Sequence, residues 1–303
     1  MGNKPLTVLI TEFLEEQDVS DLSRKSYRIV ILQFVRWVVI NKVEFWKIRR
    51  ADIIRYKSDL VKTGKASNTL DLYLTVVRKF FQWLEYRGLY ENIAAGVHSP
   101  RKYRGFKKEY LQRDQVKQLL SVIDTGKVVG KRDFAIISLM VRAGLRAVEV
   151  CRMAVGDIVR GAQYTVRLQR KGHTEKDCEV GVTDKIIEAI HDYLLSRKDV
   201  MTEGSPLFVS HSRMNPGCRL TPRRINRIVK KYLCMIGIED RRITGHSLRH
   251  TAAILSLKAG ATIDEVQQML GHASIETTKI YLSAIEEETR LNNRAARILD
   301  KLF

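Results

Sequence analysis

The stretch LGHASIETTKIYLSA, residues 270–284, places a tyrosine nine residues after a histidine. A tyrosine in a helix is usually a packing residue, and only its neighbours can indicate another role. Thr262 and Glu265 form a capping box that starts one helix, Gly271 can end it, and Ser274 can cap the next. His272 should therefore lie in a turn between two helices. On one straight helix, His272 and Tyr281 would face opposite sides at about 100° per residue, whereas a turn lets both reach one pocket.

Three further stretches carry cationic or basic side chains that could act on a phosphate. GHSLRH places His246 and Arg249 three residues apart, on one helical face. AGLRAVEV places Arg146 two residues after a glycine stop, at the start of the following helix. Lys171 lies at or near the tip of a hairpin between QYTVRLQ and KDCEVGV. Each feature alone is weak, because a lysine near a hairpin tip is more often solvated than catalytic.

Together these stretches resemble the tyrosine recombinase, or phage integrase, family. The matching motifs are AGLRAVEV, QRKGHTEK, GHSLRHTAA and LGHASIETTKIY, in the family's order. Their spacing also fits, with 23 residues from Arg249 to His272 and nine from His272 to Tyr281. The resemblance covers roughly residues 111–285, and the N-terminal helices are similar to the family's core-binding domain more loosely. Four ordered motifs favour a catalytic role for Tyr281 over a packing role.

The resemblance implies a DNA strand transferase with Tyr281 as its nucleophile. Tyr281 would attack the scissile phosphate, form a 3′-phosphotyrosine and release a 5′-hydroxyl, which later attacks a partner strand. Arg146 and Arg249 suit the phosphate, because guanidinium groups bind phosphate oxygens bidentately. Neither a metal nor a cofactor is expected.

The remaining site residues are also implied by the resemblance. Lys171 would protonate the 5′-oxygen, His246 would accept the tyrosine proton, and His272 would hydrogen-bond the phosphate. Glu149, one helical turn from Arg146, would orient the site without reacting. Lys176 is an alternative for this role. We favour Lys171, because Lys171 precedes a glycine as in the family.

Hydrophobic periodicity predicts a fold that is mainly α-helical with a small β-hairpin insert. SRKSYRIVILQFVRWVVI and ASNTLDLYLTVVRKFFQWLEYRG read as N-terminal helices, the second opening on an Asn68–Asp71 capping box and stopped by Gly88. KRDFAIISLMVRAG reads as a buried helix stopped by Gly144. Later helices are expected in DKIIEAIHDYLLSRK, TPRRINRIVKKYLCMIG and SLRHTAAILSLKAG.

Composition changes along the chain predict two domains that form a C-shaped clamp around DNA. Five of the eight residues from 101 to 108 are basic, which favours a linker. The family often has an Asn-Pro pair at the end of the first domain, whereas this chain has Asn92-Ile93. The predicted parts are a helical core-binding (SAM-like) domain over 1–92, a basic linker over 93–110 and a catalytic domain over 111–303. The catalytic domain ends in a predicted tail helix over 286–303.

The formal net charge of +19 favours a polyanionic partner, and nucleic acid before an anionic membrane. No apolar run reaches the roughly 18 residues that a membrane span needs. Four cysteines without CxxC spacing are typical of a reducing cytoplasm, so we expect a cytoplasmic protein. Because the expected partner is DNA, we expect it to associate with the nucleoid of a prokaryotic host. The residues predicted to contact DNA are Arg24, Lys25, Lys65, Ser67, Asn68, Thr69, Arg78, Lys79, Arg101, Lys102 and Arg104.

The resemblance also implies partners. The substrate would be double-stranded DNA with inverted-repeat core sites, and the protein would form a homotetramer on paired sites. Leu291, Ala295, Ile298 and Leu302 form an apolar stripe that could pack on its own domain or exchange onto a neighbouring protomer. Integration or excision of a mobile element, chromosome-dimer resolution and DNA inversion all use this machinery.

Three other functions compete with this interpretation. A catalytically silent DNA-binding regulator should lack a catalytic residue, and none is missing. His246 and His250 have a metal-binding spacing, but the motif lacks the hydrolase glutamate and Arg249 would repel a cation. A type IB topoisomerase or telomere resolvase would share the chemistry, although the chain is short for a resolvase.

Overall fold

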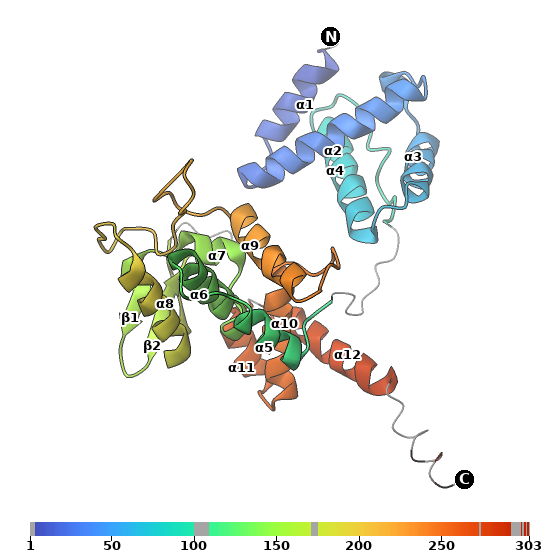
Figure 1. The fold of residues 1–303 in the computed structure, drawn as a ribbon. Coiled ribbons are helices and arrows are strands. Elements are labelled where there is room, and N and C mark those ends of the chain that lie inside the picture. Colours follow the sequence, from blue (N-terminus) through green and yellow to red (C-terminus); the bar gives the residue numbers. More distant parts are fainter. Residues whose placement is uncertain are drawn as a thin grey trace. The chain divides into compact units, whose positions relative to one another are not determined.

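The computed structural model describes residues 4–99, 109–170, 175–272, 274–291, 298, 300 and 302 (Figure 1). Contacts divide the chain into two compact units, Met1–Arg104 and Gly105–Phe303. Both units are mainly helical, as the hydrophobic periodicity predicts, and the second contains a small sheet. Among the described residues, no helix combines the length and apolarity that crossing a membrane requires.

Within residues 4–99, the described part of the first unit, four α-helices pack around an aromatic core. Phe13, Phe34, Phe80 and Phe81 are fully buried, and the Phe13 and Phe80 rings meet edge to face with centroids 5.1 Å apart. Such edge-on pairs are favourable because the positive ring edge meets the negative face. The helices are α1 (Leu6–Glu15), α2 (Asp21–Ile40), α3 (Arg50–Lys62) and α4 (Ser67–Tyr86), with a 3-10 turn, η1, at Phe45–Lys47.

The two N-terminal helices predicted from periodicity are confirmed as α2 and α4, but the predicted start of α4 is wrong. The helix begins at Ser67 with Ala66 at its N-cap, and no side chain caps it. Asn68 therefore lies inside the first turn and cannot act as the cap. Gly88, with φ of 64°, follows the helix as predicted.

The second unit surrounds a three-stranded antiparallel sheet with helices. The sheet has the order β1-β2-β3, and Val166 of β2 pairs with Val180 of β3, both buried. The predicted hairpin is thus confirmed, whereas β1 was not predicted because three residues carry too short a pattern. The elements are α5 (Arg113–Ser121), α6 (Val128–Arg142), α7 (Ala147–Arg152), η2 (Val155–Asp157), β1 (Ile158–Arg160), β2 (Tyr164–Leu168), β3 (Cys178–Gly181), α8 (Asp184–Ser196), α9 (Pro222–Met235), α10 (Gly245–Lys258), α11 (Ile263–Leu270) and α12 (Glu276–Leu291).

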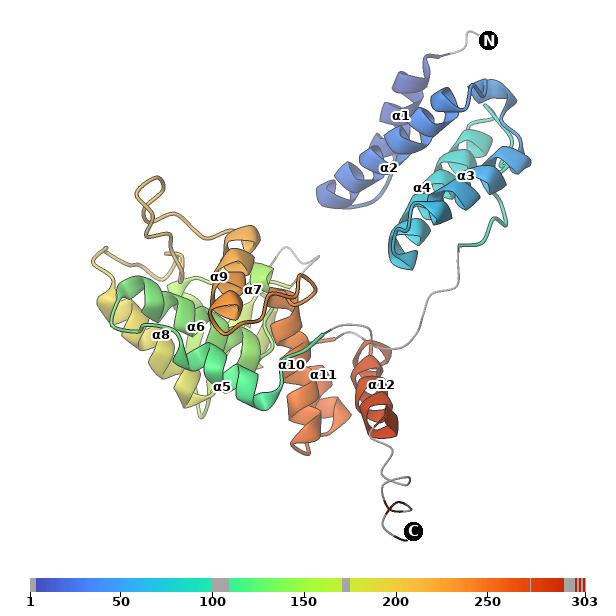
Figure 2. The same ribbon diagram turned by 45° about the vertical axis from the view of Figure 1, so that its right-hand side comes forward.

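Helices α10, α11 and α12 lie side by side and enclose a smaller core of their own (Figure 2). Tyr281 belongs to this core with Ile254, Val266 and Leu270. The C-terminal part of α12 is also anchored to its own unit. Glu288 accepts hydrogen bonds from Lys258 at 2.5 Å and from Tyr110 at 2.6 Å. The helix that carries Tyr281 is therefore docked on its own unit.

The predicted C-terminal apolar stripe is only partly described. Ile298 is 51% exposed and Leu302 is 70% exposed. Ala295 and the side chain of Leu291 lie outside the described residues. The two described members of the stripe therefore do not pack into the core of their own unit.

Candidate active site

Arg249 is the most deeply buried charged group of the candidate site. It lies on α10 with 1% of its surface exposed, and it donates to the carbonyls of Gly144 and Leu270 at 2.7 Å each. Gly144 follows α6 with φ of 66°, and a Cβ there would come within 2.6 Å of the Leu270 side chain. Glycine is thus required at this turn, which presents its carbonyl to the guanidinium.

Arg146 and Glu149 hold each other at the start of α7. Arg146 is the N-cap residue, and its backbone N–H donates to Glu149 Oε2 at 2.7 Å. Its Nη1 donates to Oε1 of the same carboxylate, also at 2.7 Å. Glu149 Oε2 additionally lies 4.0 Å from Arg249 Nη1. One buried carboxylate therefore orients both arginines and offsets their mutual repulsion.

The cationic environment shows in the pKa of Arg249. Burial and, after it, the nearby charge of Arg146 lower this pKa to about 10, while Glu149 opposes the shift. Two guanidinium groups this close favour an anion between or beside them, because an anion relieves their repulsion. The pair can therefore bind a phosphate.

Tyr281 lies beside a histidine that the sequence interpretation did not assign to it. Its hydroxyl is 2.9 Å from His250 Nδ1, and the side chain is 1% exposed. Burial raises the pKa of Tyr281, whereas Arg249 and Arg146 act to lower it. The exposed His246 meets the His250 ring edge-on, with centroids 4.4 Å apart. His250 thus contacts the Tyr281 hydroxyl directly, although its sequence signal suggested only a metal-binding spacing with His246.

His272 occupies the turn between α11 and α12, as the capping pattern predicts. The Thr262–Glu265 capping box is formed, Gly271 ends α11 with φ of 58°, and Ser274 Oγ accepts from the Glu276 backbone. The His272 ring stacks on Tyr281 with centroids 6.3 Å apart, and its Nδ1 is 2.9 Å from Thr278 Oγ1. The turn thus brings the two residues together.

His272 should make the stability of the protein depend on pH. Burial, followed by the charge of Arg249, lowers the pKa of His272 to about 4 from its usual value of 6.5. The unfolded chain therefore binds the proton first as the pH falls below 6.5, so the His272 contribution is present above that value and is lost toward pH 4. The slope is at most about 1.4 kcal/mol per pH unit, and less with solvent screening. Between pH 6.5 and 5, thermal melting should show a steeper loss for the wild type than for His272→Gln, and equal slopes would contradict this.

The structure describes one of the two candidate hairpin lysines. Lys171 lies outside the described residues. The alternative, Lys176, bonds both carboxylate oxygens of Asp157 at 2.7 and 2.5 Å. An ammonium held by two carboxylate bonds is a poor proton donor to another group, so this ion pair favours Lys171.

The residues predicted to contact DNA have mixed environments. Arg24 donates to the carbonyl of Leu14, in the last turn of α1, and to that of Gln17, just beyond the helix. Arg78 donates to the carbonyl of Val97. These two arginines therefore stabilise the first unit. Lys79 lies over the Tyr27 ring at 5.6 Å. Ser67 and Thr69 are half-buried, the exposed members are Lys25, Lys65 and Asn68, and Arg101, Lys102 and Arg104 lie outside the described residues.

A basic face on α9 was missed by the sequence interpretation. Arg223, Arg224 and Arg227 are exposed at the start of this helix and line a hollow of about 250 Å³ together with Arg219. The signal was available, because TPRRINRIV spaces these arginines along one turn of a helix that begins at Pro222. This face is a second candidate for phosphate contact.

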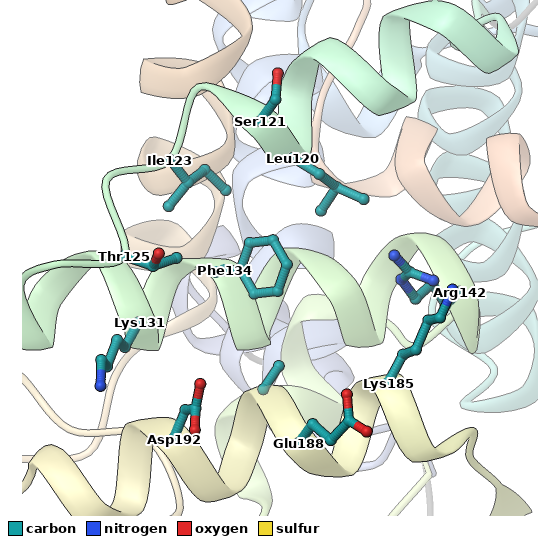
Figure 3. Close-up of a pocket in the computed structure, with 11 residues that line it drawn as sticks. Leu120, Ser121, Ile123, Thr125, Lys131, Phe134, Arg142, Lys185, Glu188 and Asp192 are labelled. Atoms are coloured by element: carbon teal, nitrogen blue, oxygen red, sulfur yellow. The ribbon is translucent and has the colours of Figure 1, made fainter.

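A separate hollow of about 500 Å³ lies between α5, α6 and α8 (Figure 3). Leu120, Ile123 and Phe134 form its apolar lining, and Lys131 and Asp192 are among its charged residues. None of the candidate catalytic side chains lines it. Among the described residues, no group of three or more His, Cys, Asp or Glu side chains is placed to hold a metal ion.

Comparison with known proteins matches both parts of the chain. The model of the phage integrase family matches residues 109–288, and that of the phage integrase N-terminal SAM-like domain matches residues 10–88. Tyrosine recombinase XerC of Thermodesulfovibrio yellowstonii is 30% identical over 282 residues, covering 90% of each chain. Tyrosine recombinase XerA of Thermococcus onnurineus is 30% identical over 297 residues, covering 97% of this chain and 98% of the relative.

Solved structures share the fold at lower identity. XerH recombinase bound to a palindromic difH substrate, in a post-cleavage complex, has a TM-score of 0.74 at 20% identity, covering 96% of this chain and 84% of that one. A lambda integrase dimer, residues 75–356, bound to a COC′ core site has a TM-score of 0.68 at 17% identity, covering 89% of this chain and 96% of that one.

Proposed function

Because the chain belongs to the phage integrase family of tyrosine recombinases, we propose that it recombines specific DNA sites through a 3′-phosphotyrosyl intermediate at Tyr281. The family consists of enzymes that transfer DNA strands in site-specific recombination. The observation that carries the proposal is the convergence of a tyrosine on α12, two arginines and three histidines, which lie at the start of α7, on α10 and in the α11–α12 turn. A mobile element that integrates or excises is the proposed context.

In the proposed cleavage step, the Tyr281 oxygen bonds to the scissile phosphorus and the bond from phosphorus to the 5′-oxygen breaks. Arg249 and Arg146 bind the non-bridging oxygens and stabilise the charge that develops on them. A guanidinium has five N–H donors, so the two bonds from Arg249 to carbonyls do not exhaust it. Glu149 keeps both arginines in place.

The proton transfers follow from where the histidines lie. We infer that His250 holds the phenol while Tyr281 is buried, and that His246 accepts its proton once Tyr281 has moved to the phosphate. His246 is suited to this because it is exposed on the α10 face that also carries Arg249. His272 would hydrogen-bond the phosphate, and Lys171 would protonate the leaving 5′-oxygen.

This chemistry should not require a metal, because the arginines supply the positive charge. The yield of covalent adduct on a nicked suicide duplex should be the same, within about twofold, in EDTA as in Mg²⁺. The measurement is a denaturing gel of both reactions at matched ionic strength. A reaction that stops in EDTA and recovers with added Mg²⁺ would overturn the metal-independent mechanism.

The proposed DNA partner is a duplex with inverted-repeat core sites. Each of the two units would contact the duplex. The proposed domains are a core-binding domain of residues 1–92, a linker of 93–110 and a catalytic domain of 111–303. Lys25, Lys65 and Asn68, and the α9 face of Arg223, Arg224 and Arg227, are the exposed side chains suited to phosphate contact.

A homotetramer on paired sites is the proposed assembly, and the exposure of Ile298 and Leu302 supports exchange of the tail between protomers. We propose a cytoplasmic location on the nucleoid of a prokaryotic host, because the substrate is DNA.

One observation favours a second candidate, a catalytically silent DNA-binding protein of the same fold. Tyr281 is 1% exposed and contacts His250, as a packing tyrosine would. If the protein bound its DNA site specifically but never formed an adduct, even with partner proteins supplied, this second function would replace the first.

A further inference from the structure

Arg170 connects the lysine hairpin to the histidine turn. It lies two residues beyond the end of β2, and its Nη1 donates to the carbonyl of Leu270 at 3.0 Å and also to that of Gly271. These carbonyls end α11, where the helix dipole concentrates negative charge. The hairpin is thus tied to the turn that carries His272.

Gly271 accommodates this contact closely. A Cβ on Gly271 would lie only 1.3 Å from Arg170 Nη1 and 1.6 Å from its Cζ. The guanidinium therefore occupies the space that any other residue type at position 271 would fill. Gly271 serves two purposes, because it ends α11 in the left-handed conformation and also admits Arg170.

The contacts of Arg170 converge with those of the phosphate-binding arginines. The carbonyl of Leu270 accepts from Arg170 and also from Arg249. This carbonyl at the end of α11 is therefore bonded both to α10 and to the segment that follows β2. The Arg170 carbonyl in turn accepts from Arg152 at 3.3 Å, at the end of the helix that carries Glu149. Both the backbone and the side chain of Arg170 are therefore fixed to elements of the site.

We propose that Arg170 is a positioning residue for strand cleavage, holding the start of the β2–β3 turn so that the next residue, Lys171, can protonate the leaving 5′-oxygen. The proposal rests on the proposed function, because it concerns the cleavage step at Tyr281. A proton donor acts only within hydrogen-bonding reach, and displacement by about 1 Å can cost about 10²-fold in rate. A guanidinium suits the task because its planar fork can bond two carbonyls that a single ammonium would hold less rigidly.

A sulfur substitution distinguishes positioning of the proton donor from a general structural role. Single-turnover cleavage would be measured on nicked suicide duplexes with the ordinary 5′-oxygen or with sulfur at that bridging position. On the sulfur substrate the Tyr281 oxygen bonds to phosphorus, the phosphorus–sulfur bond breaks, and the thiolate leaves with the electron pair without needing a proton. Arg170→Ala should be slower by about 10²-fold on oxygen and within about threefold of wild type on sulfur. Lys171→Ala should show the same pattern.

Two further variants control for charge and for the hairpin itself. Arg170→Lys keeps the charge but not the fork, so it should also lose rate on oxygen and recover on sulfur. Arg167→Ala removes the same charge from β2 at an exposed side chain that lies 3.8 Å from Glu179, and it should cleave both substrates as the wild type does.

The possible results distinguish a failure of the positioning role from a failure of the proposed function. An Arg170→Ala protein that is slow on both substrates, or on neither, would overturn the positioning role. Wild-type protein that forms no adduct on either substrate would overturn the proposed function itself, and the role of Arg170 with it.

Discussion

Tyr281→Phe should form no covalent adduct with DNA and should still bind its site with an affinity within about twofold of wild type. The change removes only the hydroxyl, which lies 2.9 Å from His250, and keeps the ring that packs among α10, α11 and α12. Loss of one buried hydrogen bond costs about 1 kcal/mol, so the fold should persist. Adduct formation on a suicide duplex and a mobility-shift titration measure the two quantities.

Tyr232→Phe is the matched control. Tyr232 is also buried in the second unit, and its hydroxyl donates to Asp133 at 3.0 Å. This variant loses a comparable hydroxyl but should cleave at the wild-type rate. Persistence of the adduct in Tyr281→Phe would show that another residue is the nucleophile.

Arg249→Lys should reduce single-turnover cleavage by about 10³-fold and lower the free energy of unfolding by about 2–4 kcal/mol. Arg249 donates separate N–H groups to Gly144 O and Leu270 O, and a lysine ammonium cannot reproduce that planar geometry while also binding a phosphate. The two losses have distinct causes, because the carbonyl bonds stabilise the fold and the remaining donors serve the phosphate. Quench-flow cleavage and urea unfolding measure them separately.

Arg142→Lys is the corresponding control, because Arg142 is an exposed arginine at the end of α6. It should match the wild type in both cleavage and stability. If Arg249→Lys cleaved within about threefold of wild type, Arg249 would not be part of the phosphate clamp.

Local sequence signals predicted the positions of the site residues well. The Thr262–Glu265 capping box and Gly271 correctly placed His272 in a turn, and from that turn its ring meets Tyr281. Arg146 lies two residues after Gly144 and is the N-cap residue of the next helix, as its motif indicates. Such signals involve residues a few positions apart, so the local chain determines the structure.

Contacts between distant segments could not be predicted in the same way. His250 meets Tyr281 across 31 residues, and Arg170 meets Leu270 across 100. The first pairing depends on how α10 and α12 pack, and the second on how the segment after β2 meets the end of α11. The capping box at Asn68 failed for a related reason, because the chain enters α4 two residues earlier than the pattern suggests.

The side chains suited to contact DNA were the least predictable from sequence. Arg24 and Arg78 donate to carbonyls of their own unit, whereas the exposed α9 arginines lie in a helix whose basic residues were not singled out. A basic residue type does not by itself distinguish a phosphate ligand from a residue that caps a helix. The available carbonyls around each side chain decide, and these become visible only in the folded chain.

The central claim is that Tyr281 becomes covalently joined to a 3′-phosphate of DNA. The most direct test is to trap the adduct on a suicide duplex from the protein's own locus, digest both components and identify the joined peptide by mass spectrometry. We expect a nucleotide linked through its 3′-phosphate to Tyr281, with a free 5′-hydroxyl on the released strand. A link to another residue, or through a 5′-phosphate, would contradict it.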